Sequence, residues 1–370
     1  MSPYGDPSRY IKHLHVDEQC LDLAYTKEIL GRCTLPVTVV KTGEIPFVEG
    51  EFPENLTLGK RHLFLTRNRG RFFKPCPATK EYRCCGYHVL NMGMNCPMDC
   101  VYCILQAYLN NPWISCYVNI EDMFEELDAA LAEEPEKIFR IGTGEFADSL
   151  ALDRITGLSR HLVSRIAASG NAVLELKTKS VVIENLRDLD HRGRTVVAWS
   201  LNSPAIIAGE EIRSAGLNER LEAAATCASW GYKLAFHFDP IVDHPGWREG
   251  YGETITKLFS VIDPENIAWI SMGALRYLPA LKAIAVQRFG SSRMFYNEFI
   301  EGLDGKARYF RDQRLELYKH VAGEINRYLT GKTVLYFCME SDVIWKDVLG
   351  YTPEEKGGLD AMLDRSVANN

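Results

Sequence analysis

Apolar and polar positions along residues 119–272 follow two alternating periods, and this alternation predicts strands separated by helices. Short runs rich in β-branched and aromatic residues, which favour buried strands, stand at 137–142, 172–177, 195–201, 232–238 and 267–272. Apolar residues at helical spacing occupy the stretches 121–134, 152–168, 181–189, 217–230 and 247–262. Strands that alternate this regularly with helices form parallel βαβ units with right-handed crossovers.

A further strand is expected over residues 87–92, which brings the number of strands to six. An open or partial (βα) barrel over residues 85–277 is the natural closure of such a sheet, so the expected fold class is α/β. The chemistry of (βα) barrels lies at the C-terminal ends of their strands. Cys96 follows the first of the six strands, so a site built around Cys96 would lie at that end.

The residues before the barrel, 1–84, are expected to form an N-terminal α/β extension. Apolar residues at helical spacing predict a helix over 18–30 that Gly31 ends, and a β-branched run predicts a strand over 35–40.

The residues after the barrel, 278–370, no longer alternate and are expected to form a C-terminal helical and β extension. We expect a long helix over 306–329 and a strand over 333–338. The tail beyond Thr352 is polar and is expected to fray.

Composition narrows the class of protein. With 46% apolar and 25% charged residues in 370, the chain is an ordinary globular sequence without a run of ~18 apolar residues, so no membrane span is expected. The first residues lack the pattern of a secretion signal, and the eleven cysteines then indicate a reducing cytoplasm and metal binding rather than disulfides. The net charge of −7 argues against a surface that is basic throughout, but not against a local basic groove.

Three cysteines in the order C-x3-C-x2-C, Cys96, Cys100 and Cys103, carry the clearest chemical signal. Cysteine thiolates are the usual ligands of iron–sulfur clusters. Three ligands in one short loop would leave one iron of a [4Fe–4S] cluster open to an outside ligand, and Tyr102 could cover the face of the cluster. The other interpretations are a zinc site and three unrelated buried cysteines. Zinc favours two C-x2-C pairs or added histidines, and the nearest histidine is His88.

The cysteine spacing resembles the signature of the radical S-adenosylmethionine (SAM) enzymes. In those enzymes the open iron binds the amino and carboxylate groups of SAM, and an electron from the cluster cleaves SAM to methionine and a 5′-deoxyadenosyl radical. Residues 142–145, after the second strand, are similar to a Gly-Gly-Glu-type segment that meets the SAM amino group, and glycines allow such close approach. The residues expected around the cofactor are Gly142, Thr143, Gly144, Glu145, Lys179, Ser200 and Asn202, with Glu145 and Tyr102 assigned to the chemistry.

Lys179, at the end of the third strand, could face the SAM carboxylate, although an ordinary polar strand end explains it equally well. Ser200 and Asn202 fall on one side of the fourth strand because side chains alternate along a strand, so both could hydrogen-bond SAM.

A basic stretch over residues 59–74 contains six basic residues and no acidic residue. The aromatic residues interleaved with them are Phe64, Phe72 and Phe73. Phosphate groups and unstacked bases favour such surfaces, so Arg69 and Arg71 are candidate nucleic-acid contacts. The alternative is a solvated strand edge whose hydrophobic face is buried.

His237, Arg276 and Tyr277 follow or end later strands and are candidate substrate contacts. Arginine binds phosphate in a bidentate manner, and tyrosine can stack on a base. A hydrogen-bonded core histidine is the default interpretation of His237.

Cys76, Cys84 and Cys85 could hold a second metal, but their spacing matches no common ligand set. We favour packed thiols near the main cluster for these three residues.

Longer runs resemble spore photoproduct lyase and its relatives. They are C-P-x-D-C-x-Y-C-x-L-Q at 96–106, N-P at 111–112, Y-V-N at 117–119, T-K at 178–179, S-x-N at 200–202, P-I at 240–241 and G-W-x-E-G-Y at 246–251. The resemblance implies a partial (βα)6 radical SAM barrel, a [4Fe–4S] cluster, SAM, an electron donor such as flavodoxin or ferredoxin, and repair of a thymine lesion in DNA. In that family the radical takes a hydrogen from the lesion, the cross-link breaks, and a cysteine returns a hydrogen atom.

The chain departs from this family at the hydrogen donor. The position of the donating cysteine aligns with Glu145, and a carboxylate is a poor donor of hydrogen atoms. The tyrosine that follows the third cluster cysteine in the lyase is Ile104 here, whereas Tyr102 is retained. Cys116 or Cys338 could substitute as the donor.

Three functions therefore stay open. The first is a radical SAM enzyme of the lyase-like group that acts on a nucleic acid or nucleotide. The second is a radical SAM enzyme that modifies a peptide or small metabolite and needs no cysteine donor. The third is a non-catalytic iron–sulfur protein for electron transfer or sensing.

Overall fold

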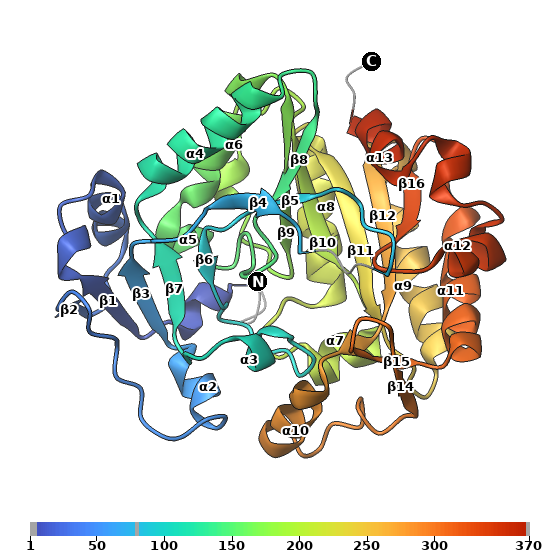
Figure 1. Ribbon diagram of the computed structural model, residues 1–370, viewed down its shortest axis with the longest axis horizontal. Coiled ribbons are helices and arrows are strands. Elements are labelled where there is room, and N and C mark those ends of the chain that lie inside the picture. Colours follow the sequence, from blue (N-terminus) through green and yellow to red (C-terminus); the bar gives the residue numbers. More distant parts are fainter. Residues whose placement is uncertain (1–5, 78–80, 368–370) are drawn as a thin grey trace.

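An eight-stranded curved sheet forms the centre of the fold (Figure 1). The computed structural model describes residues 6–77 and 81–367, so the outermost residues of both expected extensions (1–5 and 368–370) and residues 78–80 lie outside the described part. In sheet order the strands are β16 (Val334–Phe337), β12 (Ile267–Ala274), β11 (Lys233–Ile241), β10 (Thr195–Ser200), β9 (Ala172–Thr178), β8 (Phe139–Gly142), β5 (His88–Leu90) and β4 (Phe73–Pro75).

All six strands predicted from the sequence are present, and they pair in parallel from β5 to β12. The expected partial barrel is therefore confirmed. Two strands extend it at its edges: β16 pairs in parallel with β12, and β4 pairs antiparallel with β5. The predicted strand over 333–338 is thus part of the barrel sheet rather than of a separate layer.

Helices cover the outside of the curved sheet (Figure 1). They are α4 (Ile120–Glu133), α6 (Leu158–Ser169), α8 (Leu217–Ser229), α9 (Trp247–Val261) and α11 (Arg311–Asn326). The short helices α5 (Asp153–Thr156) and α7 (Pro204–Glu210) belong to the connections that follow β8 and β10. The helix predicted over 152–168 is divided at Gly157, whose φ of +62° lies in the left-handed region. The helix predicted over 181–189 is wrong, because that stretch contains only a 3-10 turn over Glu184–Leu186.

A second sheet of five strands lies beside the barrel and carries the N-terminal residues (Figure 1). Its order is β2 (Val37–Val40), β1 (His13–Asp17), β3 (His62–Thr66), β7 (Ile114–Tyr117) and β6 (Gly93–Met94). The helix expected over 18–30 is a 3-10 turn followed by α1 (Ala24–Arg32), which continues past Gly31. Both sheets share one hydrophobic core. The short helices α2 (Asn55–Gly59) and α3 (Leu105–Tyr108) precede β3 and β7 of the second sheet, and both lie below the two sheets in Figure 1.

The C-terminal segment returns to the barrel instead of extending away from it. Its elements are β13 (Arg276–Tyr277), α10 (Pro279–Arg288), β14 (Phe299–Glu301), β15 (Ala307–Tyr309), α12 (Asp342–Leu349) and α13 (Leu359–Val367). The long helix begins at Arg311 rather than at residue 306, because residues 307–309 pair with β13 and β14 in a small antiparallel sheet.

The expectation that the tail frays is wrong for residues up to 367. Helix α13 packs against β12 and β16 and buries Leu359, Met362 and Leu363. Arg140 on β8 joins the same contact, since its Nε donates to Asp364 at 2.8 Å and its Nη2 donates to Asp360 at 3.1 Å. The arginine side chain is buried, so two carboxylates of the tail neutralise a charge inside the fold.

No helix within residues 6–77 and 81–367 combines the length and the apolar character that a membrane crossing requires.

Replacing Asp364 by alanine removes one of the two carboxylates that face this buried guanidinium. We expect the free energy of unfolding to fall by about 1–3 kcal/mol, the usual range for a hydrogen bond to a charged group. Equilibrium urea unfolding measures the change. Asp347→Ala, which breaks the solvent-exposed pair with Arg311, is the matched control and should cost roughly 0.5 kcal/mol or less. Equal midpoints for the two variants would contradict a role of Arg140 in anchoring the tail.

Candidate active site

The side chains of Cys96, Cys100 and Cys103 line one pocket at the C-terminal end of the barrel strands. The loop that carries them follows β5 and the short strand β6. The opposite wall comes from the segments that end or follow β8, β9 and β10, with the residues Gly144, Glu145, Ala147, Asp148, Lys177, Thr178, Lys179 and Ser200. The parallel sheet therefore brings the cysteines and four of the predicted cofactor residues together where (βα) barrels place their chemistry.

The backbone of the cysteine loop is fixed at several points. Asn95 has a left-handed φ of +73°, and its N–H donates to the carbonyl of Phe146 at 2.8 Å. The N–H of Asp99 donates to Ile212 O and that of Val101 to Glu210 O, each at 2.9 Å. These bonds to the loops after β8 and β10 set the distance between the cysteines and the opposite wall of the pocket.

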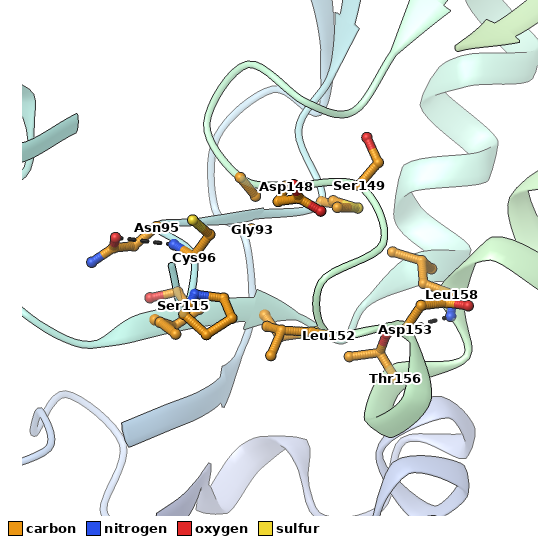
Figure 2. Close-up of a pocket in the computed structure, with 15 residues that line it drawn as sticks. Gly93, Asn95, Cys96, Ser115, Asp148, Ser149, Leu152, Asp153, Thr156 and Leu158 are labelled. Atoms are coloured by element: carbon orange, nitrogen blue, oxygen red, sulfur yellow. Dashed lines mark hydrogen bonds between the residues drawn. The ribbon is translucent and has the colours of Figure 1, made fainter. Parts of the chain in front are cut away.

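A second and smaller pocket lies behind Cys96 (Figure 2). Figure 2 shows Cys96 with its N–H bonded to the side-chain oxygen of Asn95, at 3.0 Å. Cys116, one of the two sequence candidates for a hydrogen donor, also lines this pocket. Its thiol is buried, which raises its pKa to about 12.

The three loop cysteines fit a cluster that binds each ligand through a different iron. Burial raises the pKa of Cys96 to about 12, and the Lys60 ammonium opposes this shift. The same ammonium would stabilise the negative charge of thiolates bound to a cluster. In the described part of the chain no three His, Cys, Asp or Glu side chains are arranged to hold a single metal ion. A cubane cluster does not require such convergence, because its protein ligands are spread over separate irons.

Tyr102 lies on the pocket wall within a buried network of charged side chains. Its hydroxyl donates to Glu211, which also accepts from Arg220 at 2.6 Å. The Lys179 ammonium lies 5.4 Å from the centre of the Tyr102 ring. Burial opposes the charge on Lys179, but Glu211 and Cys100 raise its pKa above the ordinary value, so this lysine is a cation in the pocket.

Glu145 reaches the pocket on a turn that Asp148 holds in place. One carboxylate oxygen of Asp148 accepts from Leu150 N at 3.0 Å, and the other accepts from Lys179 N at 2.9 Å. This aspartate therefore ties the loop after β8 to the end of β9, which carries Lys179. Gly144 packs closely against Lys177, since a Cβ at Gly144 would lie 3.2 Å from the Lys177 Cβ.

Three predicted cofactor residues do not line this pocket. The Thr143 hydroxyl donates to Ser149 at 2.8 Å. A Cβ at Gly142 would lie 1.1 Å from the hydroxyl of Tyr87, so this glycine makes room for a tyrosine. Asn202 bonds to Pro240 O at 2.8 Å and to the Tyr251 hydroxyl at 2.6 Å. Strand β10 ends at Ser200, so the alternation that would place Asn202 beside Ser200 stops there.

The candidate substrate residues near the later strand ends are engaged with protein partners. His237 is buried between Glu175 at 2.8 Å and Ser271 at 2.6 Å, which matches the core-histidine interpretation. Arg276 forms a bidentate pair with Asp239 at 3.1 and 3.2 Å. Tyr277 is buried and makes edge-to-face contacts with two phenylalanines.

The basic stretch is divided between the surface and the interior. Arg69 and Arg71 are exposed in the turn between β3 and β4, beside α4 and apart from the residues that line the cysteine pocket. The prediction of aromatic side chains available for stacking is wrong, because Phe64, Phe72 and Phe73 are all buried. Phe64 lies on β3 and Phe73 on β4, so these side chains serve packing rather than an exposed surface.

Four thiols, those of Cys76, Cys84, Cys85 and Cys338, lie close enough to one another to interact. Cys84 is near Cys76 and Cys85, and Cys338, which follows β16, is within electrostatic reach of Cys85 and Glu145. An isolated bridge between Arg83 and Glu340 holds the two segments together. The interpretation of these residues as packed thiols, rather than ligands of a second metal, stays a prediction.

Several residues of the site were not identified from the sequence. Asp148, Glu211, Arg220, Lys60 and Arg288 surround or support the cysteine loop. Asp99 was part of the signature but had no assigned role. For Asp99 the available signal was a charged residue among the mostly apolar positions of the cysteine loop, since such charges are normally paired. For Lys60 the basic stretch gave no such signal.

Comparisons with known proteins agree with this geometry. A family model described as "Spore photoproduct lyase" matches residues 77–338. The spore photoproduct lyase of Geobacillus sp. (strain Y412MC61) is 27% identical over 259 residues, which are 68% of this chain and 76% of that protein. The enzyme of the same name from Clostridium acetobutylicum is 20% identical over 331 residues, 86% of this chain and 96% of that protein. A solved mutant of spore photoproduct lyase, with bound AdoMet and dinucleoside spore photoproduct, has a TM-score of 0.80 at 24% identity and covers 90% of this chain and 99% of its own.

We predict that replacing any one of Cys96, Cys100 or Cys103 by alanine abolishes the cluster, because each thiolate would hold a separate iron. Iron and sulfide content after anaerobic reconstitution is the measurement. Cys33→Ala, at the end of α1, is the control and should keep the wild-type content. Full iron content in any of the three loop variants would contradict the assignment.

We also predict that Glu145→Ala weakens SAM binding and SAM cleavage by roughly 10- to 100-fold, the loss expected for one hydrogen bond from a charged group. Isothermal titration with SAM and chromatography of 5′-deoxyadenosine measure the two effects. Glu136→Ala, on an exposed turn before β8, serves as the control. Unchanged affinity and turnover would remove Glu145 from the cofactor site.

Proposed function

The chain belongs to the spore photoproduct lyase family of radical SAM enzymes, and on that premise we propose that it repairs a thymine lesion in DNA. One observation supports this proposal most strongly. Cys96, Cys100 and Cys103 share a single pocket with Glu145 and Lys179. The three cysteines proposed to bind the cluster thus share a pocket with an acid and a cation, and these two groups suit the amino and carboxylate groups of SAM.

In this proposal the three cysteines hold a [4Fe–4S] cluster, and SAM lies beside it. When bound, the cluster and SAM supply the one-electron chemistry that removes a hydrogen atom from a substrate. Glu145 accepts hydrogen bonds from the amino group, Lys179 faces the carboxylate, and Ser200 donates from the end of β10. Tyr102 is held by Glu211 and covers the same pocket. A flavodoxin- or ferredoxin-like protein supplies the electron.

Hydrogen return requires a thiol that is protonated at neutral pH, and we assign this role to Cys338. Burial raises its pKa to about 11, so the S–H bond is present at pH 7. Its sulfur lies 3.5 Å from a guanidinium nitrogen of Arg276, at the end of the seventh parallel strand. Neither thiol lines the pocket that contains Glu145, but Cys338 is within electrostatic reach of Glu145. Cys116 is the weaker candidate, because it lines the pocket behind Cys96.

A nucleic-acid substrate is supported by the solved relative, which holds a dinucleoside spore photoproduct. Arg69 and Arg71 are exposed, so they could contact phosphates outside the cofactor pocket, as surface cations do in nucleic-acid binding.

A second candidate function is the modification of a peptide or small metabolite. Glu145 favours it, because a carboxylate stands where the family has its hydrogen donor.

The deciding experiment uses anaerobically reconstituted protein with dithionite, SAM and dinucleoside spore photoproduct in D2O. We expect 5′-deoxyadenosine together with repaired dinucleotide, and deuterium in the product, because thiol hydrogens exchange with solvent. Cys338→Ser should leave SAM cleavage intact and reduce repair at least tenfold, whereas Cys227→Ser, at a buried position of α8, should change neither.

Other outcomes point elsewhere. SAM cleavage without repair of the dinucleotide or of lesion-containing DNA would favour the peptide or metabolite substrate. A reducible cluster without SAM cleavage would indicate an electron-transfer or sensor protein. Repair by Cys338→Ser at the wild-type rate would contradict the assignment of that thiol. Weaker, salt-dependent DNA binding by Arg69→Ala would support a nucleic-acid substrate.

A further inference from the structure

Three buried charged side chains lie beneath the cysteine loop. Lys60 follows α2, Asp99 belongs to the loop itself, and Arg288 ends α10. Their side chains are 2–3% exposed. The position of Lys60 was not anticipated, because the basic stretch suggested a cation at the surface.

The distances show one anion between two cations. The Lys60 ammonium lies 3.0 Å from one oxygen of Asp99, and the Arg288 guanidinium lies 2.9 Å from both oxygens. The hydroxyl of Thr57 donates to the same carboxylate at 2.7 Å. The carboxylate bridges an ammonium and a guanidinium group, and two cations this close favour its charged form. Asp99 is therefore ionised, and the group carries one positive charge in excess.

The excess charge lies next to the predicted cluster ligands. Lys60 donates to the carbonyl of Met98 at 2.5 Å, two residues after Cys96 and two before Cys100. Both Cys96 and Cys103 are within its electrostatic reach. An unbalanced buried cation is costly unless a nearby anion compensates it. Cysteine ligands bind as thiolates, so a bound cluster would supply that negative charge.

We infer that Lys60 and Arg288 raise the reduction potential of the cluster by placing net positive charge beneath its binding loop. Reduction adds an electron to a site that thiolates already make negative, so a buried cation stabilises the reduced form more than the oxidised form. Asp99 acts in the opposite direction and moderates the effect. This inference rests on the proposed cluster and extends it to residues outside the ligand loop.

The competing explanation is purely structural, with the three side chains acting only to hold the loop. The two explanations predict different signs for the shifts in the reduction potential. A tether predicts that every disruption loosens the loop and moves the potential in one direction. Charge tuning predicts that removing a cation and removing the anion move the potential in opposite directions.

The experiment compares Lys60→Gln, Arg288→Gln and Asp99→Asn in reconstituted full-length protein. Each substitution removes a charge and keeps a group that can hydrogen-bond. Midpoint potentials come from redox titration followed by electron paramagnetic resonance, with iron content measured in parallel. Lys332→Gln, at an exposed site beside Glu265, is the matched control and should keep the wild-type potential.

We expect more negative potentials for Lys60→Gln and Arg288→Gln and a more positive potential for Asp99→Asn. Potentials that do not move, or that all move in one direction, would overturn the inference. If Lys60→Gln or Arg288→Gln fails to take up iron, the other cation variant and Asp99→Asn still shift in opposite directions or do not. If Asp99→Asn fails, positive or absent shifts in both cation variants overturn the inference, and negative shifts in both support it. Opposite shifts of the potentials without SAM cleavage would support the charge effect and contradict the proposed function. Unchanged potentials with normal SAM cleavage would contradict the charge effect and leave the proposed function supported.

Discussion

The carboxylate of Asp99 is the contact on which the arrangement of the site depends. It joins the turn after α2, the cysteine loop and the end of α10, three segments that are far apart along the chain. A buried carboxylate is stable only when its partners are in place, so these segments must reach their positions together. The ion pairs of Asp99 with Lys60 and Arg288 consequently hold the loop that carries the cysteines on one side. Backbone hydrogen bonds to neighbouring segments hold it elsewhere.

Periodicity was sufficient to predict the barrel, because local sequence determines both the strands and the helices between them. All six strands predicted between residues 87 and 272 are present, and most of the helices begin and end close to where they were expected. Long-range pairing was not accessible in this way. The addition of β16 to the sheet and the docking of α13 both depend on contacts with β12, more than 50 residues earlier in the chain, and no local pattern specifies these contacts. The polar residues of the tail looked solvated because the buried arginine that they neutralise lies on β8.

Within the site, spacing identified the cysteine loop, and a family resemblance identified the turn at Gly144 and Glu145. The failures have a common physical cause: a side chain's direction depends on where its strand ends and on what already occupies the space. Asn202 follows the end of β10 and is engaged by Tyr251. The phenylalanines of the basic stretch belong to the core, and Lys60 serves an internal carboxylate. A run of like charges in the sequence therefore does not by itself predict a charged surface, because some of its residues can be buried.

The contact between Gly142 and Tyr87 has a consequence for how this chain can change. The hydroxyl of Tyr87 occupies almost the place that any Cβ at position 142 would take. Neither residue can be exchanged freely while the other stays, so the two positions should vary together among descendants of this sequence. An alanine at 142 would require a shorter aromatic or an aliphatic side chain at 87. A glycine that looks like part of a cofactor motif thus has an internal steric role in this chain, and a glycine at this position alone does not indicate that a chain binds SAM.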